Sequence, residues 1–225
     1  RSKIHLLPLG VPGQDFVRAN EVTEEASSRP LTVGYLARLA PEKGLHHLLN
    51  AFAPLQARHP EARLRIGGYE PTQHRKYISE QRRRAEFISP QIEFIGSPNT
   101  LEEKVAFFRS IDVLSVPTDF EEPKGLPVLE AWANGVPVVQ PAVGAFLELI
   151  GDSGEGGLLV PHRNPQALAA AWSQLISDRP KLLVLAQKGY EKVREHHSHS
   201  AVARVTLSAL QSVKSGTALA CRGVE

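Results

Sequence analysis

Six short apolar runs, separated by stretches with the periodicity of helices, constrain the fold of this chain more than any other feature. Apolar runs of this length are typical of strands buried on both faces of a sheet. Parallel strands need crossover connections, which are almost always helical and right-handed. We therefore predict an α/β fold with a doubly wound, parallel, six-stranded sheet that is Rossmann-like, with strands at residues 31–39, 62–68, 91–95, 112–116, 136–140 and 157–160.

The chain is long enough to bury one sizeable core, because it has 225 residues of which 42% are hydrophobic. We predict an interdomain connector at residues 1–30, a single domain at residues 31–199, and a C-terminal helix with a flexible tail at residues 200–225. The sequence contains no Met, not even at position 1. This absence suggests a mature or excised fragment of a longer protein.

The charge balance argues against nucleic acid as the main partner. The formal charge is only +2, from 26 basic and 24 acidic residues, although a small polyanion remains open as a ligand. The single Cys221 excludes an intrachain disulfide and agrees with a reducing compartment. No apolar run approaches the roughly 18 residues needed to span a bilayer. The sequence therefore favours a soluble, cytoplasmic protein.

The segment at residues 116–139 combines an acidic loop with a short helix. Pro127 suits the first helical turn and Gly135 suits the residue just past the helix end. Glu122 and Glu130 bracket the start of this helix, and Glu130 lies opposite the arc that packs, so we expect a free carboxylate there. Unpaired backbone N–H groups at a helix start attract phosphate, and here they would belong to Gly125, Leu126 and Val128. Two carboxylates beside an anion site suit a sugar joined to a phosphate.

Ligands of doubly wound sheets bind beyond the carboxyl ends of the strands, near the switch point. The predicted strands place one set of polar and glycine residues along that edge: Arg38, Lys43, Gly68, Gly96, Glu122 and Gly144. The convergence of two basic side chains with two acidic ones is the central prediction for the site.

Several other polar clusters favour simpler explanations. Asp119, Glu121 and Glu122 match no metal-binding loop, so we interpret them as solvated acids. The three histidines near the C-terminus lack further ligands at zinc spacing, which favours a polar helix end at His196, His197 and His199. The basic triplet 82–84 is interpreted as a solvated helix face, with attraction to acidic lipid headgroups as the alternative. Two tryptophans are predicted in the core, Trp132 and Trp172.

These residues together resemble the C-terminal half of the group 1 retaining glycosyltransferases, which have the GT-B architecture of two Rossmann-like domains. The strongest element is the acidic pair Glu122 and Glu130, with seven residues between them. The second is the run 38–44, RLAPEKG, after the first predicted strand. Weaker matches in the same order are 94–96, Gly144 with Glu148, and 157–161, and the resemblance covers about residues 3–200.

The resemblance implies a role for each matching residue. Arg38 and Lys43 would hold the diphosphate of a UDP-, GDP- or ADP-sugar. Glu130 would bind the ribose hydroxyls and Glu122 the transferred sugar. The loop near Ser97 would contact the base. Lys124 stands where the family usually has an aromatic residue. It would reach the sugar or phosphate, together with the helix start at Gly125 and Leu126. No Asp-x-Asp pair is present, so we expect no essential metal and no cofactor.

The resemblance also implies a missing partner domain. The N-terminal domain of this family supplies the acceptor site, for a sugar, a lipid-linked sugar or a small molecule, and closes over the donor. We expect the present chain alone to bind the donor and to transfer little. Two alternatives stay open: a non-catalytic nucleotide-binding module, and a sugar-nucleotide isomerase or phosphorylase of the same architecture. Peripheral contact with a membrane at its inner face also stays open.

Overall fold

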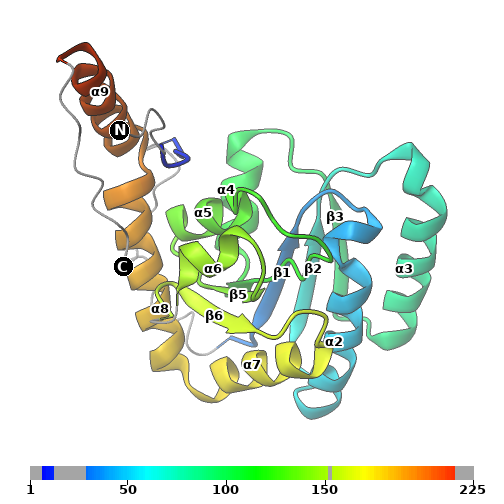
Figure 1. Ribbon diagram of the computed structural model, residues 1–225. Helices are drawn as coiled ribbons and strands as arrows, with labels where there is room; N and C mark the ends of the chain where they lie inside the picture. Colours follow the sequence, from blue (N-terminus) through cyan, green and yellow to red (C-terminus); the bar gives the residue numbers. More distant parts are fainter. Residues whose placement is uncertain (1–6, 13–28, 152–153, 216–225) are drawn as a thin grey trace.

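The computed structural model describes residues 7–12, 29–151 and 154–215, and it contains one six-stranded sheet (Figure 1). All neighbouring strands are parallel, in the order β3-β2-β1-β4-β5-β6. The strands are β1 Thr32–Leu36, β2 Arg63–Gly67, β3 Ile92–Gly96, β4 Val113–Leu114, β5 Val138–Pro141 and β6 Gly157–Val160. The predicted doubly wound α/β fold is confirmed. Its switch point lies between β1 and β4, from which the chain winds outward in both directions.

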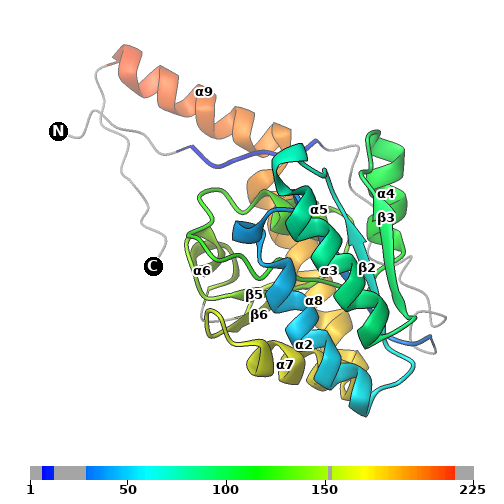
Figure 2. The same ribbon diagram turned by 90° about the vertical axis from the view of Figure 1, so that its right-hand side faces the viewer.

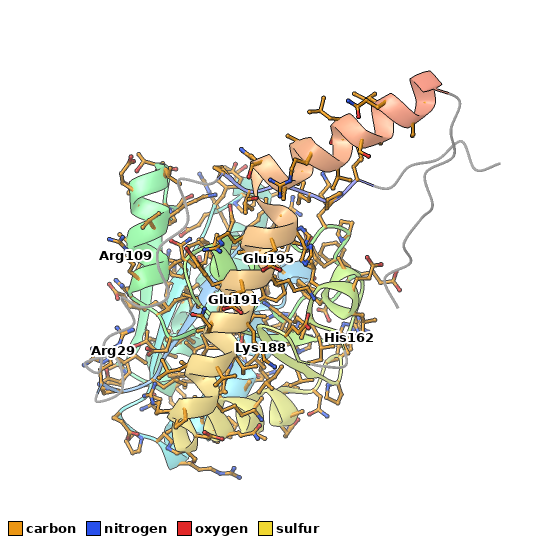
Figure 3. The ribbon with its side chains drawn as sticks, turned by 90° about the vertical axis from the view of Figure 1, so that its left-hand side faces the viewer. Arg29, Arg109, His162, Lys188, Glu191 and Glu195 are labelled. Atoms are coloured by element: carbon orange, nitrogen blue, oxygen red, sulfur yellow. The ribbon has the colours of Figure 1, made fainter. Side chains whose placement is uncertain are left out.

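Helices cover both faces of the sheet (Figures 1 and 2). They are α2 Leu45–Arg58, α3 Arg75–Ile88, α4 Leu101–Arg109, α5 Leu126–Ala133, α6 Ala145–Ile150, α7 Pro165–Ser177 and α8 Arg179–Lys192; α9, His199–Ser215, follows them. One buried apolar cluster joins α2, α3 and α7 to the sheet, and a second joins α4, α5 and α6 to it. The charged outer surface of α8 carries Lys188 and Glu191 (Figure 3).

Both tryptophans are fully buried, as predicted, and each indole N–H has a partner. Trp132 donates to the carbonyl of Gly156 at 2.8 Å, and Trp172 donates to the hydroxyl of Ser115 at 3.0 Å. A buried indole N–H without an acceptor would be costly, so these bonds select where each ring lies in the core. They also join α5 to the loop before β6, and α7 to the end of β4.

The central strand β4 is shorter than predicted. β4 covers only Val113–Leu114, because the backbone N–H of Val116 donates to the side chain of Gln140 at 2.9 Å instead of to a neighbouring strand. At the other end, buried Asp112 accepts from the backbone of Thr32 at 2.7 Å and from Arg29 at 2.8 Å. Burial raises the pKa of Asp112, while these donors act in the opposite direction. Side-chain hydrogen bonds therefore replace part of the ladder at both ends of β4.

The last helix extends away from the α/β body in both views (Figures 1 and 2). A π-helical turn, Val193–His197, connects α8 to α9. Val11 is buried at this joint and pairs with Ser198 in an isolated parallel bridge. Most of the predicted connector, and the tail from 216 to 225 with Cys221, lie outside the described residues. Within the described ranges, every helix is too short or too polar to span a bilayer.

Candidate functional site

The loops that follow β1 and β4 meet at the switch point. The hydroxyl of Thr118 donates to the carbonyl of Glu42 at 2.8 Å, and the backbone N–H of Asp119 donates to the same carbonyl at 2.9 Å. Gly44 lies against Pro117 so closely that an added Cβ would be 1.8 Å from the Pro117 oxygen, and its φ of 72° is in the left-handed region. Only glycine fits this approach, which brings the two loops together.

Lys43 and Glu122 form the ion pair at the centre of this contact. Lys43 Nζ lies 2.9 Å from Glu122 Oε2, and their side chains are only 17% and 8% exposed. The ammonium group also lies 4.5 Å from the centroid of the Phe120 ring, a cation–π distance. Glu122 Oε1 accepts from the backbone N–H of Gly125 at 3.4 Å. The sequence predicted this convergence of a basic and an acidic residue from loops 79 positions apart.

Buried Tyr35 stabilises the loop that carries Arg38 and Lys43. Its hydroxyl lies 3.3 Å from the carbonyl of Lys43 and 3.5 Å from that of Arg38. Burial raises the pKa of Tyr35 well above its ordinary value, so the hydroxyl keeps its proton as a donor. The backbone of residues 38–43 is thereby fixed to β1, and the position of Lys43 follows from it.

Arg38 lies on the same loop but pairs with Glu42, four positions along the chain, and its side chain is 48% exposed. In the structure the guanidinium thus contacts Glu42 rather than Glu122 or Glu130.

Glu130 does not have the free carboxylate that the helical wheel predicted. Lys104 of α4 donates to Glu130 Oε1 at 2.9 Å, with side-chain exposures of 41% and 22% for the lysine and the glutamate. The prediction that Glu130 lies on the outward face of α5 is correct, because the apolar residues of this helix are buried on the other side. The pairing with Lys104 was not predicted, because no local sequence pattern links α4 to α5.

The N–H groups at the start of α5 are only in part available to an anion. Val128 N–H donates to the Gly125 carbonyl at 2.9 Å, and Gly125 N–H donates to Glu122. The prediction that all three N–H groups would be unpaired is wrong, because the left-handed Gly125 folds the loop back onto the first turn. Lys124 and Leu126 are exposed on this loop, and the side chain of Leu126 is 40% exposed.

The loops that follow β2, β3 and β5 lie at the same edge of the sheet. The carbonyl of Glu122 accepts from Ala145 N–H at 2.8 Å, and a Cβ on Gly144 would lie 2.4 Å from that same carbonyl oxygen. Gly68 N–H donates to the carbonyl of Gly96 at 2.8 Å, and partly exposed Ser97 follows directly. The residues that the sequence assigned to the site thus lie on the loops that follow the carboxyl ends of the strands, except Leu126 and Glu130, which lie in α5.

The structure also shows a cluster that the sequence analysis missed. Asp119 accepts from His47 Nε2 at 2.9 Å and from Arg163 Nε at 2.7 Å, and it lies 3.4 Å from His46 Nε2. The adjacent His162, labelled in Figure 3, lies 3.1 Å from the Thr118 carbonyl. Two of the three acids of this loop therefore have basic partners, Asp119 in this cluster and Glu122 in Lys43, whereas Glu121 is exposed as predicted.

A comparison with protein families identifies the chain. The profile described as "Glycosyl transferases group 1" matches residues 18–192, which is most of the sequence. The chain belongs to the group 1 glycosyltransferases. The predicted family is confirmed, and so is the predicted position in the C-terminal half of a GT-B protein.

Curated group 1 relatives are about twice as long as this chain. It is 34% identical over 187 residues to D-inositol 3-phosphate glycosyltransferase of Corynebacterium urealyticum, a match that covers 78% of this chain and 42% of the relative. It is 32% identical over 209 residues to the putative colanic acid biosynthesis glycosyltransferase WcaL of Salmonella typhimurium, covering 89% of this chain and 50% of the relative. The chain therefore spans about half the length of the curated relatives it matches.

Solved structures of group 1 and GT-B enzymes share the fold. The C-terminal domain of the group 1 glycosyl transferase LpcC from Francisella tularensis matches with a TM-score of 0.72 and 26% identity, covering 84% of this chain and 100% of that domain. Anabaena Alr3699/HepE, solved in complex with UDP and glucose, matches with a TM-score of 0.77 and 20% identity, covering 94% of this chain and 56% of its own. The latter likeness shows the fold alone.

Proposed function

We propose that this group 1 glycosyltransferase chain is the donor-binding half of a retaining enzyme that transfers a sugar from a nucleoside diphosphate. The contact that carries the proposal is the ion pair of Lys43 with Glu122 at the switch point. It joins the β1 loop, which bears the basic residues, to the loop that leads into α5. A UDP-, GDP- or ADP-sugar would bind across this junction, with its diphosphate toward Lys43 and Arg38.

The electrostatics of the reaction suit these residues. Breaking a sugar–phosphate bond builds negative charge on the departing diphosphate while the sugar becomes cation-like. A fixed ammonium and a guanidinium stabilise the first charge, and a preorganised partner of this kind is worth about 3 kcal/mol of barrier. Lys43 is already held in place by Glu122 and by Tyr35 beneath its loop. Its position therefore needs little reorganisation when the donor binds.

The two glutamates supply acceptors for hydroxyl groups. An ionised carboxylate only accepts hydrogen bonds, so it suits sugar hydroxyls, which donate them. Glu122 would face the transferred sugar and Glu130 the ribose. Each carboxylate has a lysine partner that orients it: Lys43 for Glu122, and Lys104 for Glu130. Exposed Lys124 and Leu126 line the start of α5, and Ser97 begins the loop assigned to the base.

Calorimetry with UDP and with GDP tests the site. UDP is the first probe, since the Anabaena neighbour was solved with it. We expect binding to the wild-type chain that weakens in Arg38→Ala and in Glu130→Ala. Lys192→Ala is a matched control, because Lys192 also pairs with a glutamate, at 2.8 Å, but lies on α8. Equal affinity in the wild type and both site variants would refute the proposed site.

A longer protein that includes an upstream half tests the transferase against its rivals. We propose that such a half supplies the acceptor site, for a sugar, a lipid-linked sugar or a small molecule, and that the present chain alone binds donor but transfers little. Slow hydrolysis of a nucleotide sugar by the longer protein, with the released sugar retaining its anomeric configuration by NMR, supports a retaining transferase. Inertness toward every common donor would favour a non-catalytic binding module instead.

The transfer step is proposed to need no metal at the diphosphate. Arg38 and Lys43 would take the place of a divalent ion between protein and phosphate. We expect EDTA to leave transfer by the longer protein intact. A loss of activity that added Mg²⁺ restores would overturn this part of the proposal. The place of action is proposed to be the cytoplasm, including the inner face of a membrane if the acceptor is lipid-linked.

A further inference from the structure

We propose that His46, His47 and Asp119 form a binding site for one divalent transition-metal ion, with Zn²⁺ as the representative ion, beside the donor site. One ligand atom from each residue lies within 4.8 Å of the other two. Among the residues that the structure describes, this is the one such group of three or more His, Cys, Asp or Glu side chains. The proposal is independent of the function proposed above.

The two histidines present the same ring nitrogen to one carboxylate. His47 Nε2 lies 2.9 Å from Asp119 Oδ1, and His46 Nε2 lies 3.4 Å from Asp119 Oδ2. Two imidazole nitrogens and one carboxylate oxygen are a common protein ligand set for Zn²⁺, with the fourth position left to water or another ligand. Ligand atoms bound tetrahedrally at about 2.1 Å are roughly 3.4 Å apart. Side-chain adjustments of about 1 Å would therefore complete the site.

His46 has the outer support that metal-binding histidines usually have. Its Nδ1 lies 3.1 Å from the hydroxyl of Tyr77 on α3, and its backbone N–H donates to that same oxygen at 3.2 Å. A partner on the far ring nitrogen fixes the orientation of the ring, and an Nδ1–H that donates to the Tyr77 oxygen would leave the lone pair of Nε2 for the metal.

Arg163 orients the carboxylate without occupying all of it. Its Nε donates to Asp119 Oδ1 at 2.7 Å and a terminal nitrogen donates to the Asp119 carbonyl at 3.3 Å, which leaves Oδ2 toward His46. Arg163 has a φ of 54°, the only positive value for a non-glycine residue in the described part of the chain. Such a backbone persists only where its surroundings stabilise it. The loop after β6 is therefore held against Asp119, which keeps the carboxylate in position.

A bound ion would connect the same two segments as the Lys43–Glu122 pair. His46 and His47 begin α2 just after Lys43, and Asp119 precedes Glu122 by three positions. The three proposed ligands are 28%, 17% and 23% exposed, so an ion could enter from solvent. The expected consequence is structural: the metal stabilises the folded chain by binding it in preference to the unfolded chain.

Calorimetric titration of the untagged chain with Zn²⁺ tests the proposal. We expect one ion per chain, not displaced by excess Mg²⁺, which prefers oxygen ligands. Affinity should fall roughly tenfold in Tyr77→Phe, the typical effect of losing an outer partner, and further in His46→Asn and in His47→Asn. His196→Asn is the matched control, because His196 is exposed on the π-helical turn. Zinc should also raise the thermal midpoint of the wild type but not of His47→Asn.

Two results would overturn the proposal. One is the absence of Zn²⁺ binding by the wild-type chain. The other is equal affinity in the wild type, His46→Asn and His47→Asn, which would place the ion elsewhere. Thermal unfolding in EDTA checks that each variant is folded before the titration, and the two single variants make the test independent of a folding defect in either one.

Discussion

The Lys43–Glu122 pair should be energetically coupled, and a double-mutant cycle measures that coupling. The variants are Lys43→Met, Glu122→Gln and the two together. Exposed ion pairs are worth about 0–1 kcal/mol, whereas removing one partner of a fully buried pair costs about 3–5 kcal/mol. With exposures of 17% and 8%, this pair lies between these limits. Each single substitution should therefore cost about 2 kcal/mol of unfolding free energy.

The double variant should cost little more than either single one, because both substitutions remove the same interaction. The coupling free energy would then be about 1–2 kcal/mol. In a chain of this size, about 1 kcal/mol shifts the thermal midpoint by roughly 2–4 °C, so each single variant should melt about 4–8 °C lower. Urea denaturation of the four proteins gives the free energies, and thermal scans provide the second measurement.

The Lys192–Glu155 pair provides a matched control for this cycle. It has the same chemistry and a distance of 2.8 Å, but Glu155 is 46% exposed. Its coupling should stay below about 1 kcal/mol. Single costs for Lys43→Met and Glu122→Gln that add to within about 0.5 kcal/mol would refute the reasoning, since independent sites add in this way. So would a coupling no larger than that of the control pair.

Three further predictions concern the same edge of the sheet. Lys43→Met should weaken UDP binding by calorimetry more than Glu122→Gln does, because the diphosphate would bind Lys43 whereas UDP lacks the sugar that Glu122 would face; equal weakening by both variants would contradict this. Gly44→Ala should cost at least about 2 kcal/mol more in urea denaturation than Gly96→Ala, since both have positive φ but only the first Cβ meets a neighbouring oxygen, at 1.8 Å. Burial lowers the pKa of His46 in the folded chain below its value in the unfolded chain, about 6.5. The contribution of His46 to the free energy of unfolding is therefore complete above about pH 6.5, and it is lost as the pH falls from the pKa of the unfolded chain toward the lower pKa of the folded chain. His46→Asn should flatten that decline in denaturation measured from pH 7 to 5, and an unchanged slope would argue against it.

Local patterns accounted for much of the candidate site. The strands ended close to where the apolar runs end, and that alone brought Lys43 and Glu122 to one edge. Local patterns did not predict which groups these residues pair with. The carboxylate of Glu130 was expected to be free but pairs with Lys104, and the N–H of Val128 was expected to be free but is bonded within the turn. The assignments of individual residues to diphosphate, sugar, ribose and base stay predictions.

The His46, His47 and Asp119 cluster shows the same limit more sharply. Two adjacent histidines at the start of a helix do not indicate that both contact the same carboxylate. Asp119 lies 72 positions away from His47. The clusters that stand out in the sequence are the histidines at 196–199 and the acids at 119–122, because their members are close together in the chain. The group that converges contains one of those acids, Asp119, and two other histidines, His46 and His47.

Apolar periodicity and glycine placement in the chain were enough to determine a parallel, doubly wound sheet and the edge at which its loops meet. Burial of apolar surface acts on every residue of a run, so the pattern is redundant and survives local exceptions. Tertiary structure alone decided which charge meets which across elements, namely Lys104 with Glu130, and Asp119 with His47 and Arg163. Each such pair depends on one distance between two elements, and a single distance leaves no repeating trace in the sequence.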